Sequence, residues 1–197
     1  MKKEEILSLY QDEVQTSVSV TSFMTGVTIF FTGLLITKFD SYDISIKIPI
    51  LFLILSTFGF LYSTLIYANS SGELSRLKSE RFNKNMNIGD SIGEYIGVYF
   101  LVLAIPLVIN VITADNFLKI GTLIAALGGL SVYHISGFSI MQDHYHKMHY
   151  MLFLVVVILE IILYLTQKNI QYFIYVASFL ILYLFAITFF SRNLRRK

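Results

Sequence analysis

The segment Met151–Thr166 reads MLFLVVVILEIILYLT and carries a single charged residue, Glu160. An apolar run of this kind forms most of a membrane-spanning helix, which needs about 20 residues to cross roughly 30 Å of hydrocarbon. A helix on the surface of a soluble protein would instead place polar residues along one face at every turn. The segment therefore predicts a transmembrane helix that holds one acid inside the bilayer.

The same apolar character recurs along the rest of the chain. Of its 197 residues, 55% are hydrophobic and 14% are charged, whereas soluble domains usually carry about a quarter charged residues. The charges gather in short clusters between long apolar stretches. The fold class predicted is all-α, a polytopic integral membrane bundle that forms one transmembrane domain over residues 1–197. Its six predicted transmembrane helices are residues 17–37, 46–68, 91–112, 117–140, 148–166 and 171–190.

The connections between these segments predict which helices are neighbours. Links 38–45, 113–116 and 167–170 are short and polar, so each joins an antiparallel pair. The link between the fourth and fifth spans is also short, so these two are expected to be adjacent. The longest connection, 69–90, reads as a charged helical stem on the cytoplasmic side. Residues 1–16 have the pattern of a short amphipathic helix at the cytoplasmic surface.

Basic residues predict the orientation, because loops rich in Lys and Arg stay in the cytoplasm. With six spans and the N-terminus inside, 11 of the 15 basic residues lie on the cytoplasmic side. Both termini are then cytoplasmic, and the expected location is the cell (inner or cytoplasmic) membrane as a multi-pass protein. The expected environment is the lipid bilayer.

Several functional classes are disfavoured by composition. The chain has no cysteine, which excludes a disulfide scaffold, a thiol nucleophile and a thiolate metal site. A net charge of +2 is too small to indicate a nucleic-acid partner. We find no motif for a hydrolase, a phosphate-binding loop or a cofactor, so an enzyme is the least favoured class.

Small residues spaced four apart predict close helix packing within the membrane. Two such sets lie in spans three and four, and a related set lies in span two. They are Gly89, Gly93 and Gly97; Gly121, Ala125 and Gly129; and Ser56, Gly59 and Ser63.

Ionisable residues inside the spans are the main functional candidates, because each costs about 2.5–3.5 kcal/mol at mid-bilayer on insertion scales. Glu160 lies near the midplane, His134 lies nearer the cytoplasmic end of span four, and Asp90 and Glu94 lie at the start of span three. We expect a staircase of these groups that conducts a proton or cation, with His134 close to Glu160. The alternative is that each is a hydrogen-bonded packing group, with Glu160 protonated.

Span one carries a hydroxyl stripe on one helical face, formed by Ser17, Thr21, Thr25, Thr28 and Thr32. These hydroxyls either bond back to carbonyls of their own helix and pack on a neighbour, or they line the outward half of the same path.

A second cluster falls between spans four and five and contains Asp143, His144, His146 and His149. Imidazole and carboxylate are ligands for Zn²⁺ and similar ions, but the spacing matches no standard zinc motif. The alternative is a cytoplasmic loop whose histidines titrate near neutral pH.

Two functions follow as hypotheses. The first is a channel or carrier that moves a small solute or ion with Glu160 as its protonatable group. The second is a non-transporting membrane component, such as an assembly subunit, a sensor or the membrane effector of a stress or phage-defence system. A single bundle of this size is thin for a pore, so a homo-oligomer or a partner membrane or cytoplasmic subunit is expected.

Overall fold

The computed structural model describes the backbone of residues 3–75, 79–140 and 147–194, and the side chains of residues 8–73, 80–134 and 150–189. Every long element in these ranges is a helix, and none of the described residues forms a strand. The helices are α1 (Lys3–Thr37), α2 (Lys47–Ser75), α3 (Ser79–Ile92), α4 (Tyr99–Ile112), α5 (Asn116–Ile140), α6 (Lys147–Thr166) and α7 (Ile170–Leu194). Two single 3-10 turns, Phe39–Ser41 and Ile44–Ile46, connect α1 to α2.

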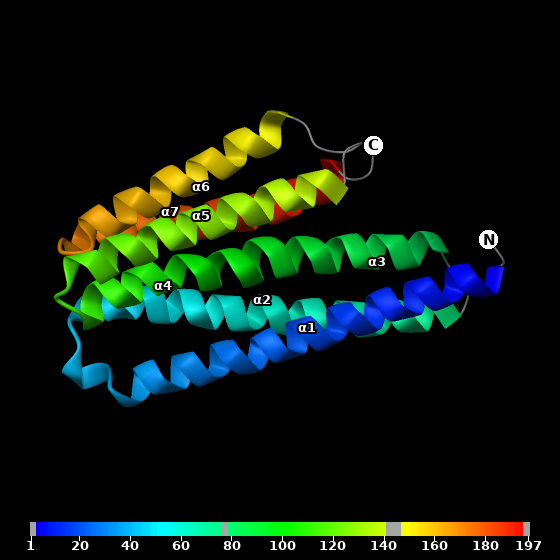
Figure 1. The fold of residues 1–197 in the computed structure, drawn as a ribbon, viewed down its shortest axis with the longest axis horizontal. Helices are drawn as coiled ribbons and strands as arrows, with labels where there is room; N and C mark the ends of the chain where they lie inside the picture. The colour runs from blue at the N-terminus through cyan, green and yellow to red at the C-terminus, as the bar shows by residue number, and fades with distance from the viewer. Residues whose placement is uncertain (1–2, 76–78, 141–146, 195–197) are drawn as a thin grey trace.

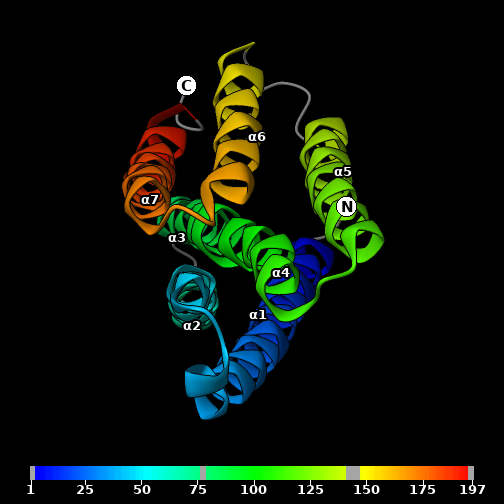
Figure 2. The ribbon, with the colours of Figure 1, turned by 90° about the vertical axis from the view of Figure 1, so that its left-hand side faces the viewer.

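Five of these helical rods are long and apolar enough to cross a membrane, and α6 supplies a shorter apolar helix. α3 and α4 count as one rod, because a π-helical segment, Gly93–Val98, joins them without a break. All the rods run roughly along one direction (Figure 1). Viewed from one end, α4 lies in the middle, with α2 below it, α5 and α7 to its sides and α6 above (Figure 2).

The core follows from this central position of α4. Its buried side chains include Phe100, Leu103 and Leu107, and they pack in one cluster with residues such as Leu163 of α6 and Leu180 of α7. Many large apolar side chains on the outer faces remain exposed. That pattern suits a bundle whose periphery contacts lipid, which is as apolar as the side chains themselves.

The N-terminal prediction of a separate surface helix is wrong. α1 runs unbroken from Lys3 to Thr37, because neither Pro nor Gly interrupts the chain before Gly26. Its first half continues alongside the end of α2 and the start of α3, beyond the ends of α5, α6 and α7 (Figure 1). At 35 residues, α1 is about 50 Å long, well beyond the hydrocarbon thickness.

The charged stem is therefore a helical extension with its own small core. Val14 of α1, Tyr67 of α2, and Phe82 and Met86 of α3 are buried together. The ring of Tyr10 meets that of Phe82 edge to face, with centroids 5.1 Å apart. Residues 69–90 form two helices rather than one, since α2 ends at Ser75 and α3 begins at Ser79.

Candidate intramembrane polar site

Glu160 lies on the inner face of α6 and is fully buried. Neither carboxyl oxygen has a hydrogen-bond partner among the described residues. Val156 and Leu163, one turn away on either side of the acid, are also fully buried. A carboxyl group in such surroundings is unusual, because buried polar groups are nearly always hydrogen-bonded.

Two buried alanines lie near the level of Glu160 on neighbouring helices. α6 and α7 are antiparallel, and the Tyr183 hydroxyl donates to the Leu152 carbonyl at 3.1 Å, a register that places Ala177 within about one helical turn of the level of Glu160. α4 runs parallel to α6, and the contacts described below place Ala104 at the same level. Both alanines are buried.

His134 of α5 is also buried, but it lies away from Glu160. Its Nδ1 atom is 3.2 Å from the Tyr99 hydroxyl, and its ring stacks on that of Phe153 at a centroid distance of 4.6 Å. Phe153 precedes Glu160 by seven residues on α6, which corresponds to about 10 Å along the helix. The imidazole and the carboxyl group therefore lie at separate levels of the bundle, and they are not the adjacent pair that their depths predicted.

A third set of polar groups, Asn110 and Gln167, lies on the other side of Glu160 from His134. Gln167 follows Glu160 by seven residues in the chain. The Asn110 amide Nδ2 donates to Gln167 Oε1 at 2.7 Å, and Gln167 Nε2 donates to the Leu107 carbonyl at 2.8 Å. Gln167 is 97% buried, since its exposed fraction is 3%. Gln167 belongs to the link 167–170 that the sequence predicted as polar, and its pairing with Asn110 was not predicted. The spacing of Phe153, Glu160 and Gln167 was the available signal, because residues seven apart share one helical face.

Three polar stations follow the seam between α4 and α6. The polar groups occupy three successive levels about 10 Å apart. The first holds Tyr99 and His134, the second Glu160, and the third Asn110 and Gln167. Val156 and Leu163, which are fully buried, lie between these levels on the same face of α6. His134 and Glu160 are groups that can take up and release a proton, whereas the amides of Asn110 and Gln167 can only exchange hydrogen bonds.

The hydroxyl stripe of α1 lies elsewhere, against α2. Thr21, Thr25, Thr28 and Thr32 each donate to a carbonyl of their own helix, at 2.7–3.1 Å. Two hydroxyls of α2 reach across to them, from Thr57 to Thr28 at 2.9 Å and from Thr64 to Thr21 at 2.7 Å. α2 and α4 stand between this stripe and α6 (Figure 2). The structure therefore does not bring the stripe to Glu160.

Asp90 and Glu94 lie near the junction of α3 and the π-helical segment. The Tyr67 hydroxyl donates to Asp90 Oδ1 at 2.7 Å, which ties Asp90 to the small core of the stem. Glu94 is partly buried inside the π-helical segment. Both acids lie on the stem side of Tyr99, so they precede His134 in the order that the staircase predicted.

The small residues of spans two and three meet where those helices cross. A Cβ atom added at Gly59 would lie 2.5 Å from the backbone nitrogen of Gly97. The Ser56 hydroxyl donates to the Gly97 carbonyl at 2.7 Å, and the Ser63 hydroxyl donates to the Gly89 carbonyl. The prediction of close packing at these glycines is confirmed.

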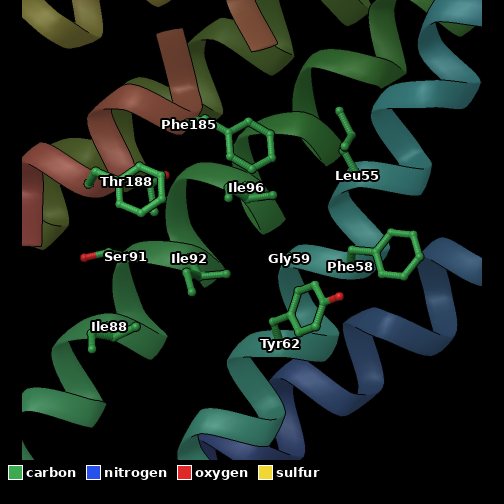
Figure 3. A pocket seen from close by; sticks show the side chains of 11 residues that line it. Leu55, Phe58, Gly59, Tyr62, Ile88, Ser91, Ile92, Ile96, Phe185 and Thr188 are labelled. Atoms are coloured by element: carbon green, nitrogen blue, oxygen red, sulfur yellow. The ribbon is translucent and has the colours of Figure 1, made fainter. Parts of the chain in front are cut away.

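An apolar cavity of about 220 Å³ opens beside this crossing, between α2, α3 and α7. Figure 3 shows Ile96, Leu55 and Phe185 around it, with the Ser91 and Thr188 side chains at one side. No charged residue lines this cavity, and Glu160 does not reach it.

The candidate metal cluster lies outside the described residues. This holds for Asp143, His144 and His146, and for the side chain of His149. In the part of the chain that the structure describes, no group of three or more His, Cys, Asp or Glu residues is arranged to hold a metal ion.

Comparisons with protein-family models, with curated proteins and with solved structures find no match to this chain.

Proposed function

We propose that this protein crosses the cell membrane six times, with both termini in the cytoplasm, and moves protons along the α4–α6 seam, alone or together with a small solute. The observation that carries the functional proposal is Glu160, a fully buried carboxyl group with no described hydrogen-bond partner. Six crossings are supported by α6, whose 20 residues extend for about 30 Å, the thickness of the hydrocarbon core.

A purely structural role does not account for Glu160. Leucine would fill the space without the free energy that is lost when an unpaired polar group is buried. A carboxyl group that takes up and releases a proton accounts for the same position, because intramembrane acids commonly mark proton relays. The buried arrangement then corresponds to an occluded state in which Glu160 carries its proton.

The neighbouring stations provide the two halves of the path. Tyr99 and His134 exchange protons with the stem side, where Asp90 and Glu94 lie. Asn110 and Gln167 hold water at the other end of the seam. Apolar side chains between the stations keep water out until the helices move apart, so the protein conducts only when α6 shifts relative to α4.

The test is proton flux into vesicles that are loaded with a pH-sensitive dye and driven by a potassium diffusion potential. We expect Glu160→Gln to lower the flux by at least about 100-fold, which is the usual contribution of a positioned proton-transfer group. Asn110→Leu should also lower it, because the path then loses its polar end.

Two matched variants separate the seam from other polar groups. Thr28→Val removes a hydroxyl of the α1 stripe, and Asp115→Asn removes an exposed acid outside the spans. Both should conduct as the unchanged protein does. Equal flux in Glu160→Gln and the unchanged protein would remove Glu160 from the mechanism, and flux no greater than in empty vesicles would exclude proton movement.

A second candidate function, an assembly subunit, is favoured by the outer face of α5. Gly121, Ala125 and Gly129 are exposed, and Cβ atoms added at Gly121 or Gly129 would meet nothing within 4 Å. Gly121 and Gly129 therefore pack on no helix within the part of the chain that the structure describes. Small residues at this spacing allow another transmembrane helix to approach closely, so a second copy or a partner subunit fits here.

The assembly candidate predicts that Gly129→Leu lowers the oligomeric mass of the purified protein in mild detergent. Gly33→Leu is the matched control, since Gly33 of α1 also has open space around it. A monomeric mass for the unchanged protein would rule out self-association through this face.

A further inference from the structure

A second, larger groove lies between α1, α2 and α4, near the ends of these helices where the chain turns. It has a volume of about 420 Å³. Its walls are apolar and include Phe31 and Leu35 of α1, together with residues of α4 from Leu101 to Ile112. Lys38 and Tyr42 stand at its mouth. A mostly apolar site with few polar groups at one end is typical of ligand pockets.

The dimensions of the groove match one lipid chain. Leu101 and Ile112 are 11 residues apart on α4, so the groove is about 16 Å long. That length is close to half of the roughly 30 Å hydrocarbon core, which is the depth of one leaflet.

A single hydrocarbon chain fits the width of the groove. A volume of 420 Å³ along about 16 Å gives a mean cross-section of at least about 25 Å². A hydrocarbon chain is one carbon thick, about 4–5 Å at van der Waals contact, and fits this section.

The charge at the mouth of the groove selects the headgroup. Lys38 is exposed and forms no ion pair with any described residue. The nearby Asp43 carboxylate accepts the Ser45 backbone N–H at 2.9 Å, which holds the pKa of that carboxyl below its ordinary value. Lys47 lies over the ring of Phe39, 5.8 Å from its centroid. Among the described residues that line the groove, Lys38 is the one with a charge, so it is the cation that an anionic group above the groove would meet.

We propose that this groove is a binding site for an anionic phospholipid, with one acyl chain between α1 and α4 and the headgroup phosphate on Lys38. The Tyr42 hydroxyl is a second donor for the phosphate. The lipid fills the space between α1 and α4, and it thereby holds α1 to the rest of the bundle. This site is separate from the α4–α6 seam, so it stands or falls independently of proton movement.

The experiment is native mass spectrometry of the full chain after reconstitution in vesicles of equal phosphatidylglycerol and phosphatidylcholine with identical acyl chains. The unchanged protein should retain one phosphatidylglycerol per chain, with about a fivefold preference over phosphatidylcholine, as expected for one lysine at the membrane surface. Lys38→Gln should abolish the preference. Ile105→Trp, at a partly exposed position in the groove wall, should lower the retention of both lipids.

Two variants serve as controls. Lys47→Gln removes a cation at the same membrane edge but outside the groove, and Leu55→Trp enters the smaller cavity that has no charged residue. Both should retain phosphatidylglycerol as the unchanged protein does. Equal retention of the two lipids by the unchanged protein would overturn the proposal, and so would a loss of preference in Lys47→Gln. It would also be overturned if the unchanged protein were a dimer without bound lipid that Ile105→Trp dissociates, because a second copy would then occupy the groove.

Discussion

Glu160 shows what a single residue contributes to this molecule. It has no exposed surface and no described partner, so the folded state bears the cost of removing a polar group from water. That cost is about 1–3 kcal/mol from mutational data. The acid is thus a position where stability and the proposed activity oppose each other.

Replacement of Glu160 by leucine should therefore stabilise the fold by about 1–3 kcal/mol while it abolishes proton flux. The measurement is thermal or denaturant unfolding in detergent micelles, together with the vesicle assay. Glu94→Leu is a useful comparison, because Glu94 is only partly buried. A loss of stability in Glu160→Leu would mean that the carboxyl makes a stabilising bond.

Gly59 is the residue at which backbone approach matters most. An added Cβ atom would lie 2.5 Å from the Gly97 nitrogen, a backbone atom that cannot move without shifting the helix. Gly59→Ala should destabilise the protein by about 1–3 kcal/mol, the usual cost of overpacking.

The matched substitution for Gly59→Ala is Gly33→Ala, where nothing lies within 4 Å of the added atom. It should be neutral or stabilising by up to about 1 kcal/mol, because alanine is the better helix former. Unfolding midpoints of the two variants, measured side by side, test the crossing. Equal midpoints would argue against close contact of α2 with the π-helical segment.

At the scale of elements, the α1–α2 pair explains the hydroxyl stripe. Thr28 bonds to its own helix and also accepts from Thr57, so one hydroxyl serves both intrahelical and interhelical bonding. The Thr21 and Thr64 hydroxyls form a second such link. These links join α1 to α2 and require no ion or solute.

The strength of this link can be measured with a double-mutant cycle of Thr28→Val and Thr57→Val. Interhelical hydrogen bonds in membranes average about 0.6 kcal/mol, so we expect a coupling energy of this size. Thr25→Val combined with Thr57→Val should show coupling near zero, since no bond joins those two hydroxyls. Coupling as large in the Thr25 cycle would show that packing, and not the bond, joins the helices.

For the whole molecule, the unequal helix lengths define two ends. α1, α2 and α3 extend past the other helices (Figure 1), and this extension contains the small core around Phe82. The tight turns, the lipid groove and Gln167 lie at the opposite end. If six helices cross the bilayer, all three tight turns face the same side, and the extension stands in the other compartment.

The absence of native cysteine makes this topology directly measurable. Single cysteines at Ser41, Asp115 and Asn169 should react in intact cells with a membrane-impermeant maleimide, whereas Ser71→Cys should react only after lysis. Labelling of Asn169→Cys only after lysis would mean that α6 does not cross, and five crossings would then place the termini on opposite sides.

The long apolar helices were predictable, because each is a local property of about 20 consecutive residues, the length that crosses a solvent unable to satisfy free backbone groups. Their predicted ends agree closely with the helices in several places, and α1 ends at Thr37 as predicted. The start of α1 was missed. A helix continues wherever nothing breaks it, and the amphipathic pattern of residues 1–16 does not show that they pack on α2 and α3.

The sequence by itself determined the apolar helices, the lone acid in α6 and the small residues that let helices approach. These depend only on residue type and spacing. Tertiary structure alone decided which faces meet. It turned the hydroxyl stripe to α2, and it placed His134 about two helical turns from the level of Glu160. It also joined Gln167 to Asn110 and left a groove between α1 and α4. The physical reason is that side chains such as Asn110 and Gln167 are far apart in sequence, and their contact depends on the registers and crossing angles of helices whose lipid-facing and buried surfaces are equally apolar.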